Sequence, residues 1–455
     1  MKKLWSLATV FACAAALVAC SGNDTSKDNS SSTPAPTTQE GETATQEGEV
    51  ATTESNDPVS FRFSWWGGDS RHNATLEVIE LYMEQNPHVT IVPEYAAWSG
   101  YQDKFTTQYA GGTNADLMQV NYNWLWIYSP DGEGFYDLST LSNLDLGNYS
   151  STILDAMTVE GKLNAIPTSI TARVPFLNTT LYEAAGIELP TTWDELMAAG
   201  NTVQEQLGDN YYALSKLGKA GMMYLVFSYL EQSTGKTFLN EEGNINYSVE
   251  ELTSGYQLLV DMVDNHVMPA GNVDSNELDE KNPKWITGEY GGINEWDSSA
   301  AKYMDTLEEG QAVTPSSQFT MDGAQLTGNI QKPSMGFAIS KNTENPEEVV
   351  KFLNWMLTDP EAVEIMETQR GIPANQAGYD ILVEKGLLTG ATVDAYNLHA
   401  DVEATIMHPF YEYTDVRDLY EGAGEAVVFG QMTAAEAAEK VINEMPSIMD
   451  EAMGR

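Results

Sequence analysis

The stretch Phe-Arg-Phe-Ser-Trp-Trp-Gly-Gly-Asp-Ser-Arg-His, residues 61–72, decides the fold of this chain. Aromatic and polar residues alternate up to Trp66, which predicts a β-strand, and two glycines then end the strand. An α/β sheet places ligand-binding groups where a strand ends and a helix follows. Neighbouring side chains of a strand point to opposite faces, so we expect Trp66 to face a cleft and Trp65 to pack behind it.

The residues that follow alternate between strand and helix patterns. Strands are expected over 89–95 and 116–121, and helices over 74–85 and 101–109. Helices of this length between strands predict a parallel sheet with crossover connections.

The ends of these strands carry similar side chains, and in a parallel sheet they meet at one edge. Aromatic rings there can stack on the C–H face of a sugar, while amides bond its hydroxyls. The chemistry therefore predicts a sugar site. Its first candidates are Trp66, Arg71, His72, Trp98, Tyr122, Asn123 and Trp124.

The charge of the chain excludes one class of partner. With 22 Lys and Arg against 67 Asp and Glu, the formal net charge is −45. No basic stripe is present to displace counterions from phosphates, so nucleic-acid binding is excluded. The acidic balance also makes an anionic ligand an unexpected one and disfavours docking on anionic lipid by charge.

The first residues have the pattern of a secretion signal. Lys2 and Lys3 precede a short apolar run, and Leu17-Val18-Ala19-Cys20 closes it. This ending resembles the lipobox of bacterial lipoproteins, which implies that residues 1–19 are removed and that Cys20 carries a lipid. The alternative is an ordinary signal peptide with an incidental cysteine. Cys13 leaves with the signal, so no internal disulfide is expected.

Residues 20–57 are expected to form the lipidated cysteine and a disordered tether. The segment is rich in Ser, Thr, Gly, Glu and Pro, and it nearly lacks large apolar residues. Such a composition cannot bury enough surface to fold. Together with the signal, it predicts an extracytoplasmic body anchored to the cell membrane by the lipid.

Several longer motifs carry a family resemblance. They are Trp-Trp-Gly-Gly at 65–68, Tyr-Ala-Gly-Gly-Thr-Asn-Ala-Asp at 109–116, Leu-Asn-Thr-Thr-Leu-Tyr-Glu-Ala-Ala-Gly-Ile at 177–187, Pro-Ser-Met-Gly-Phe-Ala-Ile-Ser-Lys at 333–341 and Arg-Gly-Ile-Pro-Ala-Asn at 370–375. In this order and spacing the chain resembles the family 1 extracellular solute-binding proteins, the sugar-binding lipoproteins of bacterial ABC importers. The resemblance covers the chain from about residue 58 to its end.

The resemblance implies an α/β fold of the periplasmic-binding-protein type. Two lobes close on a ligand in the cleft between them, and the chain crosses the hinge several times. On this basis the first lobe is expected to comprise 58–168 and 288–332. The second lobe is expected to comprise 169–287 and 333–455.

The resemblance also adds candidate ligand residues. Trp296 lies at a strand end, where related proteins present a stacking aromatic ring. Glu295 and Asp297 beside it are candidates to accept hydrogen bonds from sugar hydroxyls, or else form a solvated pair of acids. Arg173 opens the second lobe. Weaker candidates in that lobe are Tyr224, Trp285, Tyr413 and Arg417. The histidines have no metal-ligand spacing, so neither a metal nor a cofactor is expected.

The function that these features predict is capture of an oligosaccharide and its delivery to an ABC permease by a monomeric lipoprotein that is not an enzyme. A secreted glycosidase is one alternative, because Glu295 and Asp297 lie beside an aromatic residue. A carbohydrate adhesin or sensor without a transporter is the other. No nucleophile elbow or phosphate loop supports catalysis.

Overall fold

The computed structural model describes residues 57–453, except for 99, 216–218, 272–278, 300–302 and 401. The predicted signal, Cys20 and the predicted tether through residue 56 lie outside the described residues. Within the described ranges, no helix has the length and apolarity needed to cross a membrane.

The first three strands confirm the prediction made from the sequence. They are β1 (Val59–Trp66), β2 (Val89–Ala96) and β3 (Leu117–Asn121), and β1 pairs in parallel with both of the others. The connecting helices are α1 (Asp69–Gln85) and α2 (Tyr101–Ala110). Because α1 begins at Asp69 rather than at residue 74, Arg71 and His72 lie in its first turn. Asp69 in this first turn places a negative charge at the positive end of the helix dipole, which stabilises the start of α1.

The whole sheet is mixed rather than parallel. Its order is β2-β1-β3-β9-β6-β7, and the last three strands are β9 (Ile330–Ile339), β6 (Ile166–Asn178) and β7 (Gly292–Trp296). All pairings from β3 to β7 are antiparallel. Short strands β8 (Val313–Pro315) and β10 (Thr405–Ile406) pair with β6 and β9. The architecture is the predicted α/β class.

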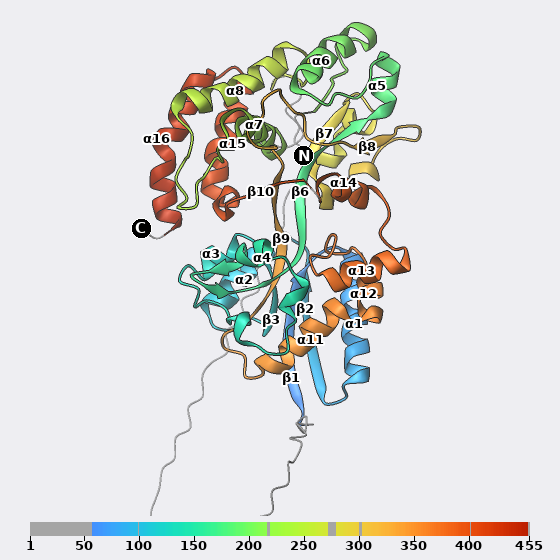
Figure 1. The fold of residues 1–455 in the computed structure, drawn as a ribbon, viewed down its shortest axis with the longest axis vertical. Coiled ribbons are helices and arrows are strands. Elements are labelled where there is room, and N and C mark those ends of the chain that lie inside the picture. The colour runs from blue at the N-terminus through green and yellow to red at the C-terminus, as the bar shows by residue number, and fades with distance from the viewer. Residues whose placement is uncertain are drawn as a thin grey trace, which may run out of the picture. The chain divides into compact units, whose positions relative to one another are not determined.

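Two strands carry the chain between its cores. β6 begins with Ile166 in a first core and reaches Leu177 in a second, while β9 runs from Ile330 in the second core to Ile339 in the first. Figure 1 shows both strands continuing from the elements of one core to those of the other. The crossings predicted near 167–171 and 331–335 therefore lie inside continuous strands.

The cores divide the chain differently from the predicted lobes. Residues 288–332 were assigned to the first lobe, but Tyr290 and Ile293 pack in a small third core and Phe319 in the second. Phe337 and Phe352, assigned to the second lobe, pack in the first core. The reason is that β7 pairs with the far half of β6, and strand pairing over this distance leaves no local pattern in the sequence.

The remaining helices cover these cores. Around the first core lie α3 (Trp124–Tyr128), α4 (Ser151–Asp155), α11 (Pro346–Thr358), α12 (Pro360–Met366) and α13 (Gln376–Lys385), with the hairpin of β4 (Thr158–Val159) and β5 (Lys162–Leu163). Around the second lie α5 (Thr179–Ala185), α6 (Trp193–Leu207), α7 (Lys219–Thr234), α8 (Val249–Asp264), α15 (Thr414–Val428) and α16 (Ala434–Ala452). Residues of α9 (Pro283–Ile286) and α14 (Ala391–His399) join the third core.

Capping explains where several of these helices begin. The hydroxyl of Thr192 accepts from the amide of Glu195, and the Glu195 carboxylate bonds back to the amide of Thr192, which forms a capping box at the start of α6. The same box starts α8 at Ser248 and α16 at Thr433. These boxes fix the start of three helices in the second lobe.

Candidate functional site

The two tryptophans at the end of β1 have different surroundings. Trp65 has no exposed surface, and its indole N–H donates to Nδ1 of His72 over 3.0 Å. His72 is thereby held as the acceptor for a core residue, and burial lowers the pKa of its imidazole. Trp66 is also buried, under the ring of Trp98 at 5.1 Å. Contact of Trp66 or His72 with a ligand stays a prediction.

Trp66, Trp98 and Trp124 form an aromatic cluster near the ends of the first three strands, and Trp98 is its exposed tryptophan. The ring of Trp124 lies 5.4 Å from that of Trp66 and is buried in the first core. Half of the Trp98 side chain remains exposed. Of the three tryptophans, Trp98 is therefore the one that presents a ring to solvent.

The end of β3 contacts the second lobe. The Tyr122 hydroxyl donates to the carbonyl of Met407 over 3.2 Å, and the Asn123 amide donates to the carbonyl of Glu412 over 3.2 Å. A cavity of about 530 Å³ lies beside them. Tyr122 and Trp126 line it from the first lobe, and residues 237–246 and 406–409 contribute from the second. The structure thus places this predicted strand end at a cavity between the lobes.

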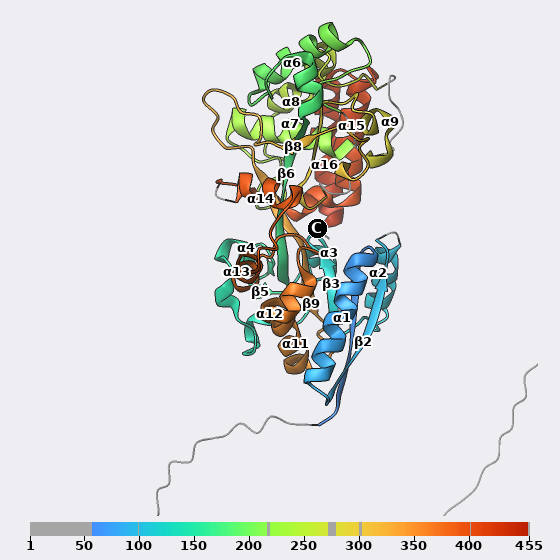
Figure 2. The same cartoon turned by 90° about the vertical axis from the view of Figure 1, so that its right-hand side faces the viewer.

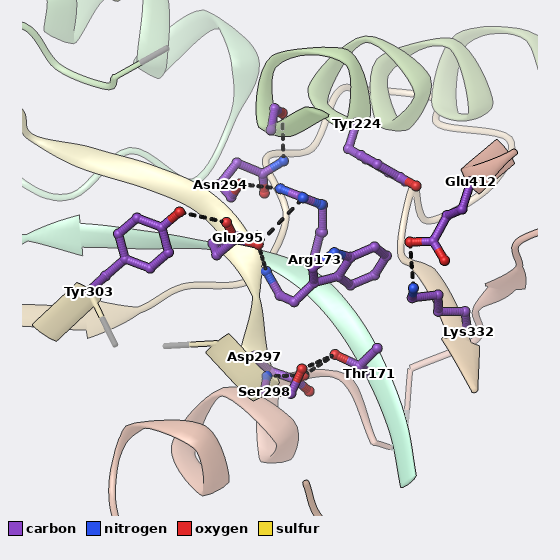
Figure 3. A network of polar contacts seen from close by, with 12 residues as sticks. Thr171, Arg173, Tyr224, Asn294, Glu295, Asp297, Ser298, Tyr303, Lys332 and Glu412 are labelled. Carbon is purple, nitrogen blue, oxygen red and sulfur yellow. Dashed lines mark hydrogen bonds and ion pairs between the residues drawn. The ribbon is translucent and has the colours of Figure 1, made fainter. Parts of the chain in front are cut away.

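Arg173 and Trp296 lie opposite each other on β6 and β7 and form the centre of a second cluster. Figure 3 shows Arg173 with Tyr224, Asn294 and Glu295 around it. The guanidinium carbon of Arg173 lies 4.8 Å from the Trp296 ring and 4.7 Å from the Tyr224 ring. Its nitrogens donate to the carbonyl of Asn294 over 2.8 Å and pair with Glu295 over 3.4 Å. Four of the predicted ligand residues, Arg173, Tyr224, Glu295 and Trp296, therefore meet in space.

A lysine that the sequence analysis missed completes this cluster. Lys332 on β9 lies 4.8 Å from the Trp296 ring and forms an ion pair with Glu412. Burial lowers the pKa of the Lys332 ammonium, and the charge of Glu412 opposes this shift. The sequence did contain a signal for Lys332, because a lysine within an otherwise buried strand is expected to need an ionic partner.

Three polar atoms of this cluster remain unpaired. Nε of Arg173, Oδ1 of Asn294 and Oε2 of Glu412 are buried without a hydrogen-bond partner. Burying such groups unpaired is costly. The cluster therefore has one unpaired donor and two unpaired acceptors near the partly buried indole of Trp296.

The two acids next to Trp296 have separate roles. Glu295 pairs with Arg173 and accepts from the Tyr303 hydroxyl over 3.0 Å. Asp297 is buried, accepts from Thr171, and lies 2.7 Å from Nε2 of His399 on α14. Asp297 thus joins the crossing strand β6 to α14 and has no surface for a ligand.

The weaker candidates fall in different places. Trp285 is fully buried in the third core, where its indole donates to the carbonyl of Tyr303, so it lies outside the cluster. Arg417 pairs with Glu421 over 3.1 Å, and its charge acts on Lys332. Tyr413 is partly buried against Phe410.

Arg71 has a buried neighbour, Arg370, that the sequence analysis did not single out. Arg71 donates to the carbonyls of Gln369 and Trp66, and Arg370 donates to the side chains of Gln119 and Thr75. Burial lowers the pKa of Arg71 to about 10, and burial and the charge of Arg71 lower that of Arg370. In the described part of the chain, no carboxylate pairs with either arginine, so this region is cationic in a protein of high negative charge.

Among the described residues, no group of three or more His, Cys, Asp or Glu side chains is arranged to hold a metal ion. The donors and rings above are instead those of a site for a polar organic ligand. A family model described as bacterial extracellular solute-binding protein matches residues 68–363. The chain belongs to this family.

Solved structures of binding proteins share the fold. A periplasmic solute-binding protein of Pectobacterium atrosepticum is 32% identical, with a TM-score of 0.81, over 87% of this chain and 99% of the other. An oligogalacturonide-binding protein of Yersinia enterocolitica, in complex with saturated digalacturonic acid, is 34% identical, with a TM-score of 0.78 and the same coverage. An ABC substrate-binding protein of Listeria monocytogenes is 18% identical with a TM-score of 0.67, which supports the fold alone.

Family membership establishes the general class of this protein. It is an extracellular solute-binding protein of the ABC-transporter type with an extracytoplasmic location. The family consists of binding proteins rather than enzymes, and sugar-binding proteins are among the similar structures.

Proposed function

We propose that this protein captures an acidic oligosaccharide outside the cell membrane and delivers it to the permease of an ABC transporter. The observation that carries the proposal is the partly buried indole of Trp296 with the cations of Arg173 and Lys332 each 4.8 Å from its ring. An indole can stack on the C–H face of a sugar, and a guanidinium recognises a carboxylate.

The unpaired atoms of the cluster support the same ligand. Nε of Arg173 can donate to a carboxylate, and Oε2 of Glu412 can accept from a sugar hydroxyl. Arg71 and Arg370, which have no carboxylate partner among the described residues, add positive charge in the first lobe. A relative that is 34% identical holds saturated digalacturonic acid, which is a sugar of this class.

This proposal revises the expectation that an anionic ligand is disfavoured. The net charge of −45 belongs mostly to a solvated surface, and water and salt screen it over about 8–10 Å. Arg173 and Lys332 are buried, so water and salt screen their interaction with a ligand carboxylate much less. Local charge therefore decides ligand preference.

Isothermal titration calorimetry with digalacturonate and trigalacturonate, beside neutral oligosaccharides and peptides, tests the proposal. We expect saturable binding of an acidic oligomer that weakens with salt. Trp296→Ala should lower the affinity and keep the fold, whereas Glu205→Gln on α6 is a control outside the cluster. Tight binding of peptides, with no binding of any oligosaccharide, would refute the proposal.

Delivery and anchoring need experiments in cells. Uptake of a labelled oligogalacturonide should fall in cells that carry only the Trp296→Ala protein. Cys20→Ala should release the protein from the membrane fraction if Cys20 carries the predicted lipid. Uptake that does not depend on this protein would favour an adhesin or sensor. Light scattering tests the predicted monomer.

A glycosidase is the second candidate function, and it rests only on the neighbouring acids Glu295 and Asp297. The contacts of these two side chains argue against it. Glu295 is held by Arg173 and Tyr303, and Asp297 is buried against Thr171 and His399. Neither carboxylate is placed to protonate a glycosidic oxygen or to activate water. Product formation on prolonged incubation with oligosaccharide would overturn this conclusion.

A further inference from the structure

A separate cavity of about 390 Å³ lies on the other side of β6 from Arg173. Ile170 lines this rear cavity, and strand alternation places Ile170 and Arg173 on opposite faces of β6. The other walls come from residues 147–153, from the start of α13 and from Tyr396 of α14. Figure 2, like Figure 1, shows α13 and α14 following one another along this side of β6.

The walls of the rear cavity are aromatic and uncharged. Tyr149, Tyr379 and Tyr396 contribute rings, and the Tyr379 and Tyr396 rings lie 6.2 Å apart. Asn148 and Gln376 contribute amides. None of the residues that line the cavity is a carboxylate or a basic side chain.

One hydroxyl in this wall lacks a partner. Tyr149 is 8% exposed, and its hydroxyl makes no hydrogen bond of good geometry, although Asn375 lies beside it. A buried hydroxyl is normally paired, but this oxygen has no exposed surface, so a ligand in the cavity meets the Tyr149 ring and reaches the hydroxyl only if the side chain shifts.

We propose that the rear cavity is a second carbohydrate site, which takes a neutral sugar unit. Tyrosine rings stack on the C–H face of a sugar. The amide N–H groups of Asn148 and Gln376 donate to Asp145 and Asp380, so their amide oxygens are the groups left to accept from sugar hydroxyls. The volume falls within the range of about 300–1,000 Å³ that ligand pockets have. A uronate would lose its hydration here without meeting a cation, so this site differs from the Trp296 cluster in the charge it accepts.

The two sites touch the same buried network. The ring of Tyr396 lies 5.3 Å from that of His399, and His399 contacts Asp297 over 2.7 Å. Asp297 directly follows Trp296. A ligand in the rear cavity is therefore expected to change the affinity of the front cluster, and the effect must be reciprocal. The existence of the rear site does not depend on the function proposed for the front cluster.

Methyl NMR on the full mature protein tests the rear site. Ile170 and Ile372 line the cavity, and their δ1-methyl signals can be assigned from Ile→Val variants. The probes are galactose, glucose, maltose and, as the charged control, galacturonate. Gln376→Trp should fill the cavity from an exposed position at the start of α13, and Tyr379→Ala removes one ring while Tyr379→Phe keeps it.

The expected result is a saturable shift of both methyl signals by at least one neutral sugar. Gln376→Trp should abolish it, Tyr379→Ala should weaken the affinity about tenfold, and Tyr379→Phe should change it little. No shift with any neutral sugar, an equal response to galacturonate, or a shift that survives Gln376→Trp would each overturn the proposal. Front-site binding of oligogalacturonide is measured separately, so failure of one site does not decide the other.

Discussion

Glu231 on α7 predicts how the stability of this protein changes with pH. The side chain has no exposed surface, and neither carboxyl oxygen has a hydrogen bond of good geometry. Burial raises the pKa of Glu231 to about 8 from its ordinary value of 4.5, and nearby Thr405 offsets only part of the rise. Glu231→Gln replaces the titrating group with a neutral one of similar shape.

The sign and size of the effect follow from proton linkage. Between pH 4.5 and about 8 the folded protein keeps the proton on Glu231 while the unfolded chain loses it, so the free energy of unfolding falls as pH rises. The difference of about 3.5 pKa units corresponds to about 5 kcal/mol at most, since each unit is worth about 1.4 kcal/mol. This is a large part of the stability of an ordinary domain.

Urea unfolding at a series of pH values from 4.5 to 9 measures this contribution. We expect Glu231→Gln to match the wild type near pH 4.5 and to become progressively more stable than it up to about pH 8. Glu205→Gln changes an exposed acid on α6 and controls for the loss of one charge. If the free energy of unfolding changes with pH in the same way for the wild type and for Glu231→Gln, the argument from burial is refuted.

Other substitutions separate packing from binding. Trp124→Ala empties the first core and should cost about 3–5 kcal/mol in urea unfolding; a cost below 1 kcal/mol would contradict its assignment to the core. Trp296→Ala should lower oligogalacturonide affinity by calorimetry while thermal unfolding stays cooperative, and unchanged affinity would remove Trp296 from the site. Glu412→Gln leaves the Lys332 charge buried and should destabilise by about 3–5 kcal/mol, whereas the double variant with Lys332→Met should recover much of the loss. If the single and double variants lose the same stability, the broken ion pair between Lys332 and Glu412 is not the cause of the destabilisation.

The strands that open the chain could be predicted because their signal is local. Alternation from Phe61 to Trp66 and the glycines after it mark β1 and its end without knowledge of any partner. The lobes could not be divided correctly, because membership of residues 290–330 depends on how β7 and β8 pair with β6. Such pairing joins residues more than a hundred positions apart.

The candidate site shows the same limit. Arg173, Glu295 and Trp296 were predicted separately, and the antiparallel register of β6 and β7 brings them together. Lys332 and Glu412 were missed, because they meet through β9 and the segment before α15. Trp285 is also a tryptophan but lies in the third core. Whether a tryptophan is part of a core or of a site depends on the residues packed around it in the folded chain.

The sequence by itself determined the α/β class, the parallel start of the sheet, the acidic surface and the family, because these depend on local patterns and composition. The tertiary structure decided which side chains share a site and what charge they present. A protein of net charge −45 buries Arg370 without a carboxylate partner among the described residues. It also holds Arg173 and Lys332, each paired with a glutamate, against the Trp296 ring. The electrostatic potential at a ligand site depends on which charged groups are buried and paired there. A count of charged residues in the sequence does not give this information.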